Sequence, residues 1–484
     1  MSRRGPATGD VGRYFEQVGG AVDKWLASDK PDPLKSGSDW RARLAGPVPE
    51  EGIGADATIN EFVDLVLPNG SRLASPASWG WITTGPTTVP TVVAAAAMIV
   101  APQRQTLTAF NQLEELSLDW LAQLCGLAEQ MKGVYSSGGS TANLVALGAA
   151  RQWALEQVGI DASAAGLDGR QLALYTSTQA HHTVHRSAGV LGMGRNSLRL
   201  IPTDAQLRMD LTALEAALHQ DRDAGVLPVA VVAAAGTTNT GAVDPLRGAG
   251  ELAREYGAWF HVDGAYGLPG ILDERVTSLY DGLELADSVI TDPHKWLGAP
   301  VGVAATFVRD RAILHRAFTQ EPADYLEGSF TDDDVQVSLD SVGVPYFDFG
   351  VELSAPPRGV MVWAILRELG VEGMRQRIVD DNNFARHVAV RANEHPRLEV
   401  LAEPVLSICG FRYRSRDAAD WDSINGQILR RLARETPIVV SSTLVDSRFV
   451  LRPCFINART TVTDVDDFLD TVIRFGDELT GFAR

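Results

Sequence analysis

The stretch DSVITDPHKWLGAP, residues 287–300, combines a short apolar run, a turn and a lysine. The run DSVIT has the composition of a buried β-strand, and the Asp-Pro pair that follows marks its end. Lys295 comes just after this turn. A single lysine after a strand is usually an ordinary surface side chain, so its meaning depends on which other side chains reach the same edge of the predicted sheet.

Short apolar runs and helical patterns alternate on both sides of this stretch, between about residues 80 and 355. The runs LALYT, LPVAVVAAAG, WFHVD and VAATFV are bounded by turn residues, and helical segments such as LTALEAALHQ lie between them. This alternation predicts an α/β domain with a largely parallel sheet. Ligands of such sheets bind at the carboxyl ends of the strands, so the residues after each run are the candidate site.

The remaining parts of the chain have other patterns. At 484 residues the chain exceeds the usual size of a single core, so more than one domain is expected. We predict a helical N-terminal arm over residues 1–78, with helices near 11–26 and 59–67. The large α/β domain is predicted over residues 79–362. A smaller α+β domain is predicted over residues 363–484.

Composition excludes several functions. The net charge is -18 and no Lys/Arg cluster is present, which argues against nucleic-acid binding and against an anionic membrane surface. The apolar segment VPTVVAAAAMIVAP is too short to span a bilayer, and we expect it to be a buried helix. The N-terminus lacks the apolar stretch of a secretory signal. The three cysteines Cys125, Cys409 and Cys454 are far apart, which predicts a reducing, cytoplasmic location.

A glycine-rich turn in VYSSGGSTANLVALGAA precedes a helical pattern. Glycines let the backbone approach a ligand closely, and the first turn of a helix offers free N–H groups to an anion. Gly139 and Ser140 are therefore candidate phosphate ligands. The alternative is that Ser140 or Thr141 only caps the helix.

Two other strand ends have side chains with more than one possible role. His181 and His185 have a metal-ligand spacing, but the glutamate of a zincin motif is missing and no third ligand is apparent, so we predict no metal site. His181 would then stack on a flat ligand or cap a turn. Asp263 ends the run WFHVD, where it would cap the next helix or pair with a cationic ring above the sheet.

In this order, these stretches resemble the group II pyridoxal-phosphate decarboxylases, the family of the aromatic-amino-acid, histidine and glutamate decarboxylases. The resemblance covers about residue 75 to the C-terminus. It is strongest at SGGSTANLVAL, QAHHTVHRSAG, AAGTTNTGAVDPL, WFHVDGAYG, ADSVITDPHKW and LRPCFINARTT. It implies pyridoxal 5'-phosphate as cofactor, fold type I of the pyridoxal-phosphate-dependent transferases with a mainly parallel seven-stranded sheet, and a homodimer with shared active sites.

The resemblance also implies roles for individual residues. Lys295 would hold the cofactor as a Schiff base, Asp263 would pair with the protonated ring nitrogen, and His181 would stack on the ring. A carboxylate about 4 Å from that nitrogen contributes on the order of 4 kcal/mol, which keeps the ring protonated as an electron sink. Further cofactor contacts are implied for Gly139, Ser140, Asn143, Thr238, Ala265 and His294.

The reaction implied is decarboxylation of an L-amino acid to its amine and CO2 through a Schiff base and a quinonoid. Tyr346 lies twelve residues before Arg358, as in the family, and would reprotonate the α-carbon. A packing role for this tyrosine is the alternative. The other possible functions are a related enzyme that releases an aldehyde, another lyase or transaminase, and a scaffold without turnover.

The segment SPASWGWITTGP matches the part of the family that surrounds the substrate, although Ser75-Pro76 replaces the usual His-Pro. Trp79, Trp81 and Phe110 favour an apolar or aromatic substrate side chain. The residues before Arg358, SAPP, depart from the basic residues that the family usually has there. The predicted substrate contacts are Trp81, Ile82, Thr83, Thr84, Phe110 and Arg358.

Overall fold

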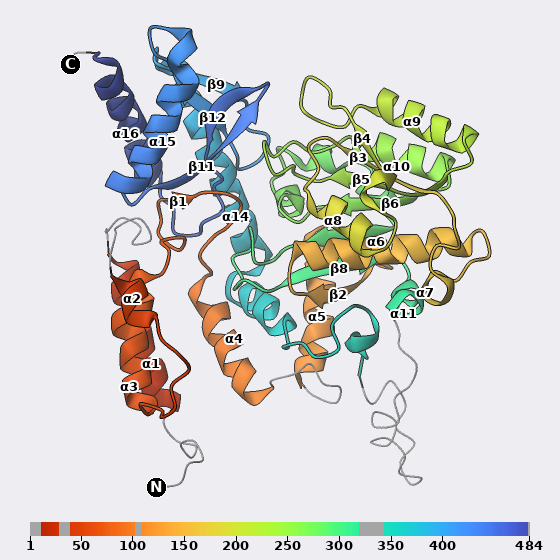
Figure 1. Cartoon of the computed structure of the whole chain (residues 1–484), viewed down its shortest axis with the longest axis horizontal. Helices are drawn as coiled ribbons and strands as arrows, with labels where there is room; N and C mark the ends of the chain where they lie inside the picture. Colours follow the sequence, from red (N-terminus) through yellow and green to blue (C-terminus); the bar gives the residue numbers. More distant parts are fainter. Residues whose placement is uncertain (1–10, 29–38, 102–108, 319–342, 483–484) are drawn as a thin grey trace. The chain divides into compact units, whose positions relative to one another are not determined.

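The computed structural model describes residues 11–28, 39–101, 109–318 and 343–482 of the chain, and Figure 1 labels their helices and strands. The chain divides into two compact units. Unit 1 comprises residues 1–81, 390–401 and 410–484, and unit 2 comprises residues 82–389 and 402–409. The three-part division predicted above, with an N-terminal arm and two domains, stays a prediction.

Unit 2 is built on a seven-stranded sheet with the order β2-β8-β7-β6-β5-β3-β4. The pairs β4/β3, β3/β5, β5/β6 and β6/β7 are parallel, whereas β8 runs antiparallel to both β7 and β2. The predicted fold class is therefore confirmed. The strands are β2 (Lys132–Ser136), β3 (Leu172–Ser177), β4 (Leu198–Ile201), β5 (Leu227–Ala234), β6 (Trp259–Asp263), β7 (Ser288–Thr291) and β8 (Ala304–Val308).

Helices cover the sheet of unit 2. Helix α6 (Gly139–Glu156) packs against β5 to β8, while α9 (Leu211–Asp223) and α10 (Leu246–Glu255) pack against β4, β5 and β6 (Figure 1). Helix α9 begins at an N-cap, where the Asp210 side chain accepts the amides of Thr212 and Ala213. The other helices here are α4 (Thr88–Val100), α5 (Ala109–Leu124), α7 (Ala162–Ala165), α8 (Thr183–Val190) and α11 (Ala312–Phe318).

Residues 89–100 of the apolar segment lie in helix α4, but the expectation that this helix is buried is wrong for the single chain. Its buried residues are Pro90, Ala94 and Ala97, all on one face. Its larger apolar side chains are exposed: Val92 is 59% exposed and Ile99 56%. A helix that is apolar on all sides needs a partner on each side, and among the described residues it packs on one side alone.

Unit 1 contains a five-stranded sheet with the order β1-β11-β12-β10-β9. Its strands are β1 (Ser78–Trp79), β9 (Leu398–Ala402), β10 (Gly410–Tyr413), β11 (Val439–Val445) and β12 (Arg448–Arg452), and its helices are α1 (Val11–Leu26), α2 (Trp40–Leu44), α3 (Ala55–Glu61), α15 (Trp421–Glu435) and α16 (Val462–Thr480). Helix α16 opens with a capping box of Thr461 and Asp464. Helix α14 (Gly359–Glu394) has residues in both units.

Trp79 belongs to the core of unit 1 rather than to a substrate pocket. Its side chain is fully buried, and its ring lies 5.4 Å from the rings of both Phe455 and Phe468. Its indole N–H donates to the hydroxyl of Thr460. This aromatic cluster gives the tryptophan a packing role, so it does not support an aromatic specificity. In the described ranges, no helix combines the length and apolar character needed to cross a bilayer.

Candidate active site

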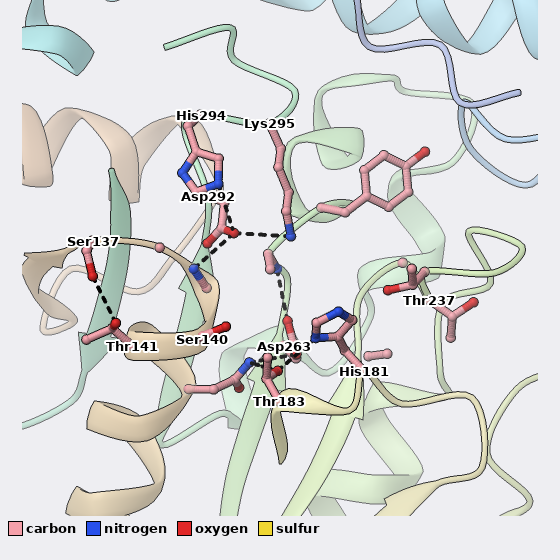
Figure 2. Close-up of a pocket in the computed structure, with 18 of the residues that line it drawn as sticks. Ser137, Ser140, Thr141, His181, Thr183, Thr237, Asp263, Asp292, His294 and Lys295 are labelled. Carbon is pink, nitrogen blue, oxygen red and sulfur yellow. Dashed lines mark hydrogen bonds and ion pairs between the residues drawn. The ribbon is translucent and has the colours of Figure 1, made fainter. Parts of the chain in front are cut away.

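A cavity of about 360 Å³ lies in unit 2 at the carboxyl ends of the parallel strands, where the α/β pattern predicted it. Figure 2 shows side chains from several strand ends that point into this cavity. The lining residues fall in the segments 137–143, 181–183, 234–238, 263–266 and 292–295, with Val301 in addition.

Lys295 enters this cavity from the turn after β7 (Figure 2). Its Nζ lies 3.1 Å from Oδ2 of Asp292, and the same oxygen accepts the amide of Gly139 at 3.1 Å. Asp292 is 2% exposed. The turn that carries the lysine thus also carries a buried carboxylate that holds the lysine. We did not predict this role of Asp292, although its place three residues before the lysine was a usable signal.

The glycine-rich turn forms a narrow cradle at the start of α6. A side chain at position 139 would place its Cβ 2.6 Å from Oδ2 of Asp292, so the backbone approaches that carboxylate more closely than any other residue type allows. The start of α6 lines the cavity, and the positive end of a helix dipole suits an anion such as a phosphate. Ser140 lines the cavity next to these amides.

Asp263 stands at the end of β6 and lines the cavity. Its Oδ2 accepts the side-chain amide of Asn143 at 3.0 Å, and its Oδ1 accepts the backbone amide of Ala265 at 3.1 Å. Both bonds fix the carboxylate at the edge of the sheet. It therefore does not cap a helix, and it is placed for a cationic ring in the cavity.

His181 also lines the cavity, and its Nδ1 lies 2.9 Å from the hydroxyl of Thr183. Burial lowers the pKa of His181, while the charge of Asp263 acts in the opposite direction. The imidazole is therefore mainly neutral near pH 7. Its ring packs at 4.1 Å from the ring of His182. A neutral, partly buried imidazole suits stacking on a flat ligand.

Other predicted cofactor contacts also line the cavity, namely Thr238, Ala265 and His294. His294 donates from Nδ1 to the carbonyl of Val303 at 2.6 Å, and burial lowers its pKa. Asn143 lines the cavity as predicted, but its amide is directed at Asp263 rather than at the phosphate cradle. Thr183, Tyr266 and Val301 are lining residues that we did not predict.

Tyr346 is not brought to this cavity. It lies in a 3-10 turn, Tyr346–Asp348, with 1% exposure, and its hydroxyl donates to Oε2 of Glu115. The guanidinium of Arg311 pairs with Glu115 at 3.0 Å. Burial and the charge of Glu115 raise the pKa of the tyrosine hydroxyl. In this arrangement Tyr346 is a packing residue, and its predicted catalytic role requires the turn to leave this position.

Arg358 is likewise engaged away from the cavity lining. Its guanidinium binds both carboxylate oxygens of Glu352, at 2.8 and 3.0 Å, and its Nε donates to the carbonyl of Gly302. Such a two-pronged pair uses the donors that a substrate carboxylate would need. We did not predict Glu352 as a partner, because its side chain meets Arg358 only through the turn that brings these residues, six apart, together.

The predicted substrate contacts at residues 81–84 and Phe110 are absent from the described lining. Trp81 belongs to unit 1, where it is 60% exposed and has a φ of +57°. In unit 2, Ile82 and Thr84 are buried and Thr83 is exposed. Phe110 is half-buried in the first turn of α5. Their substrate roles stay predictions.

The cavity combines a lysine, an anion cradle, a fixed carboxylate and a neutral imidazole, which is the set required by pyridoxal phosphate. The chain matches the model of the pyridoxal-dependent decarboxylase conserved domain over residues 93–414. The chain belongs to this family. The decarboxylase is 33% identical to the aromatic-L-amino-acid decarboxylase of Bacillus atrophaeus, over 73% of this chain and 71% of that protein.

Two further relatives are named for two different substrates. The decarboxylase is 30% identical to tryptophan decarboxylase 1 of Oryza sativa subsp. japonica over 82% of this chain and 79% of that protein. It is 31% identical to L-2,4-diaminobutyrate decarboxylase of Rhizobium meliloti over 88% and 83%. The structure of Oryza sativa TDC with PLP and tryptamine superposes with a TM-score of 0.86 at 26% identity, and covers 99% of this chain and 100% of that one.

The decarboxylase is therefore a pyridoxal-phosphate-dependent amino-acid carboxy-lyase, as predicted. The residues of the cavity fit the cofactor: Gly139 leaves room for a close backbone approach, and Asp263 offers a carboxylate for a ring nitrogen. When bound, the cofactor supplies a protonated ring that accepts the electron pair left when CO2 departs. The protein contributes orientation, charge and the exclusion of water.

Proposed function

We propose that the enzyme decarboxylates an aromatic L-amino acid to the corresponding amine. Aromatic-amino-acid, tryptophan and tyrosine decarboxylases are among its relatives at 30 to 33% identity. The single structural observation that carries the proposal is that both carboxylates in the described cavity already have hydrogen-bond or ion-pair partners. Asp263 is bonded to Asn143 and Ala265, and Asp292 to Lys295 and Gly139.

A diaminobutyrate side chain carries an ammonium group, which needs an uncommitted carboxylate when it is taken out of water. Asp263 and Asp292 are the only acidic residues among the described lining residues, and both have partners. Val301, which is 78% exposed, gives the lining an apolar side chain instead. This chemistry favours an apolar or aromatic side chain over a cationic one.

We assign the chemistry to Lys295, Asp263 and His181. Lys295 would bind the cofactor's carbonyl, since a lysine amine attacks carbonyl groups once its proton has left, and the nearby Asp292 carboxylate is the group that contacts that proton. Asp263 would hold the ring nitrogen in its charged form. His181 would orient the ring. Lys295 and His181 would also be candidates to return a proton to the substrate's α-carbon, since both line the cavity.

We also propose that the enzyme is a homodimer. The exposed apolar side chains of α4, Val89, Val92, Met98, Ile99 and Val100, support a partner on that side of the helix. A contiguous apolar face on one helix is typical of an interface. The cytoplasmic location stays a prediction, which is compatible with three cysteines that are free and buried.

The substrate proposal is tested by measuring amine release and CO2 release from purified enzyme loaded with pyridoxal phosphate. The panel consists of tryptophan, tyrosine, phenylalanine and dihydroxyphenylalanine, against 2,4-diaminobutyrate, ornithine, glutamate and histidine. We expect kcat/KM for the best aromatic substrate to exceed that for diaminobutyrate by at least about 10²-fold, a difference of about 2.7 kcal/mol. Preferential turnover of diaminobutyrate would contradict the proposal, and would favour the activity for which the Rhizobium relative is named.

A further inference from the structure

A run of buried side chains connects the start of β6 with the carboxylate at its end. The indole Nε1 of Trp259 lies 2.7 Å from Oγ of Ser288, and that oxygen lies 2.8 Å from Nδ1 of His261. Nε2 of His261 lies 3.0 Å from Oδ1 of Asn143. Nδ2 of Asn143 lies 3.0 Å from Oδ2 of Asp263. His261 and Ser288 are fully buried, and Asn143 is 1% exposed.

The carboxylate end of this run fixes the direction of its hydrogen bonds as far as Nε2 of His261. A carboxylate only accepts, so Asn143 must present its NH2 group to Asp263 and its oxygen to His261. Nε2 of His261 therefore carries a proton. At the other end an indole N–H only donates, so the oxygen of Ser288 accepts from Trp259. In a neutral His261 ring protonated on Nε2, Nδ1 has no proton, so the hydroxyl of Ser288 donates to it.

The carboxylate end of the run requires a proton on Nε2 of His261. Burial disfavours a second proton, because a charged ring would have no water contact, and it lowers the pKa of His261 to about 4. At neutral pH the ring therefore donates from Nε2 alone. This hydrogen bond keeps the side-chain amide of Asn143 from flipping.

Asn143 also reaches the second cofactor-facing residue. Its Nδ2 lies 3.2 Å from the hydroxyl oxygen of Thr183, which in turn lies 2.9 Å from Nδ1 of His181. The Thr183 oxygen accepts from Asn143, so its own proton is free to donate to His181. This bond leaves the proton of the neutral His181 ring on Nε2. One oriented amide thus contacts Asp263 directly and His181 through a single hydroxyl.

We propose that His261 is a positioning residue of the decarboxylase. It fixes the Asn143 amide, and that amide sets both the orientation of the Asp263 carboxylate and the tautomer of His181. The inference rests on the placement of pyridoxal phosphate in this cavity, and it adds that two cofactor-facing groups depend on one buried imidazole that contacts neither cofactor nor substrate.

The first test uses the wild-type protein without added cofactor, so it does not depend on the assigned reaction. Nitrogen-15 NMR of histidine-labelled protein reports which ring nitrogen is protonated in each of the nine histidines. Substitution His261→Gln identifies the signal of His261. We expect His261 to be neutral and protonated on Nε2 from about pH 8 down to about pH 5.5, since its pKa is about 4. A ring protonated on Nδ1, or on both nitrogens at pH 7, overturns the proposal.

The second test compares variants of the loaded enzyme. Glutamine places an N–H group near the position of Nε2, whereas leucine removes it, so His261→Gln should remain near wild type and His261→Leu should not. For His261→Leu we expect kcat to fall about tenfold or more with KM little changed. We also expect a shift of about one pH unit in the midpoint of the visible absorbance change of the bound cofactor. The control Thr176→Val removes a hydroxyl that is equally buried in the same sheet but bonds the Val232 carbonyl instead.

A merely structural role for His261 predicts a different pattern. Equal losses in His261→Leu and His261→Gln, or an unchanged absorbance midpoint in folded His261→Leu, would overturn the proposal. Should His261→Leu fail to fold, Ser288→Ala replaces it. That variant removes the hydroxyl that contacts Nδ1 and accepts from Trp259, and we expect His261 to stay protonated on Nε2, because Asp263 and Asn143 fix that proton. A ring protonated on Nδ1 in Ser288→Ala would count against the proposed direction of the hydrogen bonds.

Discussion

Nζ of Lys295 lies 3.1 Å from Oδ2 of Asp292, and the amide of Gly139 donates to the same oxygen. One buried carboxylate therefore contacts both the amine that would bind the cofactor's carbonyl and the cradle that would bind its phosphate. This arrangement links the two ends of the cofactor site through a single side chain. It also places a negative group where an anion is expected, which has measurable consequences.

Substitution Asp292→Asn should tighten phosphate binding. Asparagine keeps an oxygen that accepts from Gly139 but removes a charge that opposes an anion in the cradle. We expect the apoenzyme to bind pyridoxal phosphate about tenfold more tightly, which corresponds to about 1.4 kcal/mol. Titrations that follow the visible absorbance of the cofactor give the dissociation constants. Pyridoxal without phosphate is the control ligand, and an equal gain for both ligands would mean that the phosphate is not involved.

Substitution Lys295→Ala should remove covalent attachment of the cofactor and turnover together. We expect activity to fall by about 10³-fold or more, because the variant lacks the amine that takes part in the chemical steps. Mass spectrometry after borohydride reduction measures attachment. Lys132→Ala is the matched control, since Lys132 also pairs with an aspartate, Asp119, but outside the cavity. Cofactor covalently retained in Lys295→Ala would show that another amine carries it.

Tyr346→Phe separates the two roles of this tyrosine. In the described arrangement the hydroxyl of the buried tyrosine donates to half-buried Glu115, so its loss should destabilise the protein by about 1–3 kcal/mol and leave the product unchanged. Tyr175→Phe is the control, because the hydroxyl of Tyr175 donates to Asp221 at 2.8 Å and is equally buried. Urea unfolding and product analysis are the measurements. Release of aldehyde by Tyr346→Phe alone would instead establish the predicted catalytic role.

The stability of the enzyme should depend on pH through Asp381. Burial raises the pKa of this carboxyl to about 8, from 3.8 in the unfolded chain, and Trp296 donates to it at 2.8 Å. Between these values the folded protein binds a proton that the unfolded chain has lost. Stability therefore falls as pH rises from about 4 to 8, by on the order of 5 kcal/mol from this group.

The variant Asp381→Asn isolates this contribution. Asparagine is neutral at every pH and still accepts a hydrogen bond from Trp296. We expect the free energy of unfolding of Asp381→Asn to match wild type near pH 4 and to exceed it at pH 8.5. Urea titrations at the two pH values measure the difference. Parallel pH profiles of the two proteins would show that Asp381 does not titrate in this range.

Ile99→Glu should weaken self-association. Burying this side chain at an interface contributes about 1.5–3 kcal/mol, and a carboxylate in its place adds a desolvation cost, so we expect a loss of at least about 10²-fold in dimer affinity. Sedimentation equilibrium measures it. Val190→Glu, an exposed apolar residue of α8 that is 66% exposed, is the matched control. A monomeric wild-type protein would contradict the dimer directly.

The sequence alone was sufficient to predict the fold class and the groups at the strand ends. Alternating apolar runs and helical patterns correspond to the strands and helices of unit 2 because their periods are local properties of the chain. The strands that carry Asp263 and Lys295 are parallel neighbours, β6 and β7, so their carboxyl ends meet at one edge. The glycine-rich turn arrives at the same edge after β2.

The tertiary structure decided which side chains contact each other once these segments met. Asp292 and Gly139 are 153 residues apart, and Asn143 and His261 are 118 apart, so no local pattern reveals their hydrogen bonds. Tyr346 and Arg358 have the expected spacing, yet Glu115 and Glu352 occupy their polar groups. Spacing along the chain determines which groups are present, whereas the partner of each group depends on packing between distant segments, because hydrogen bonds act only over about 3 Å.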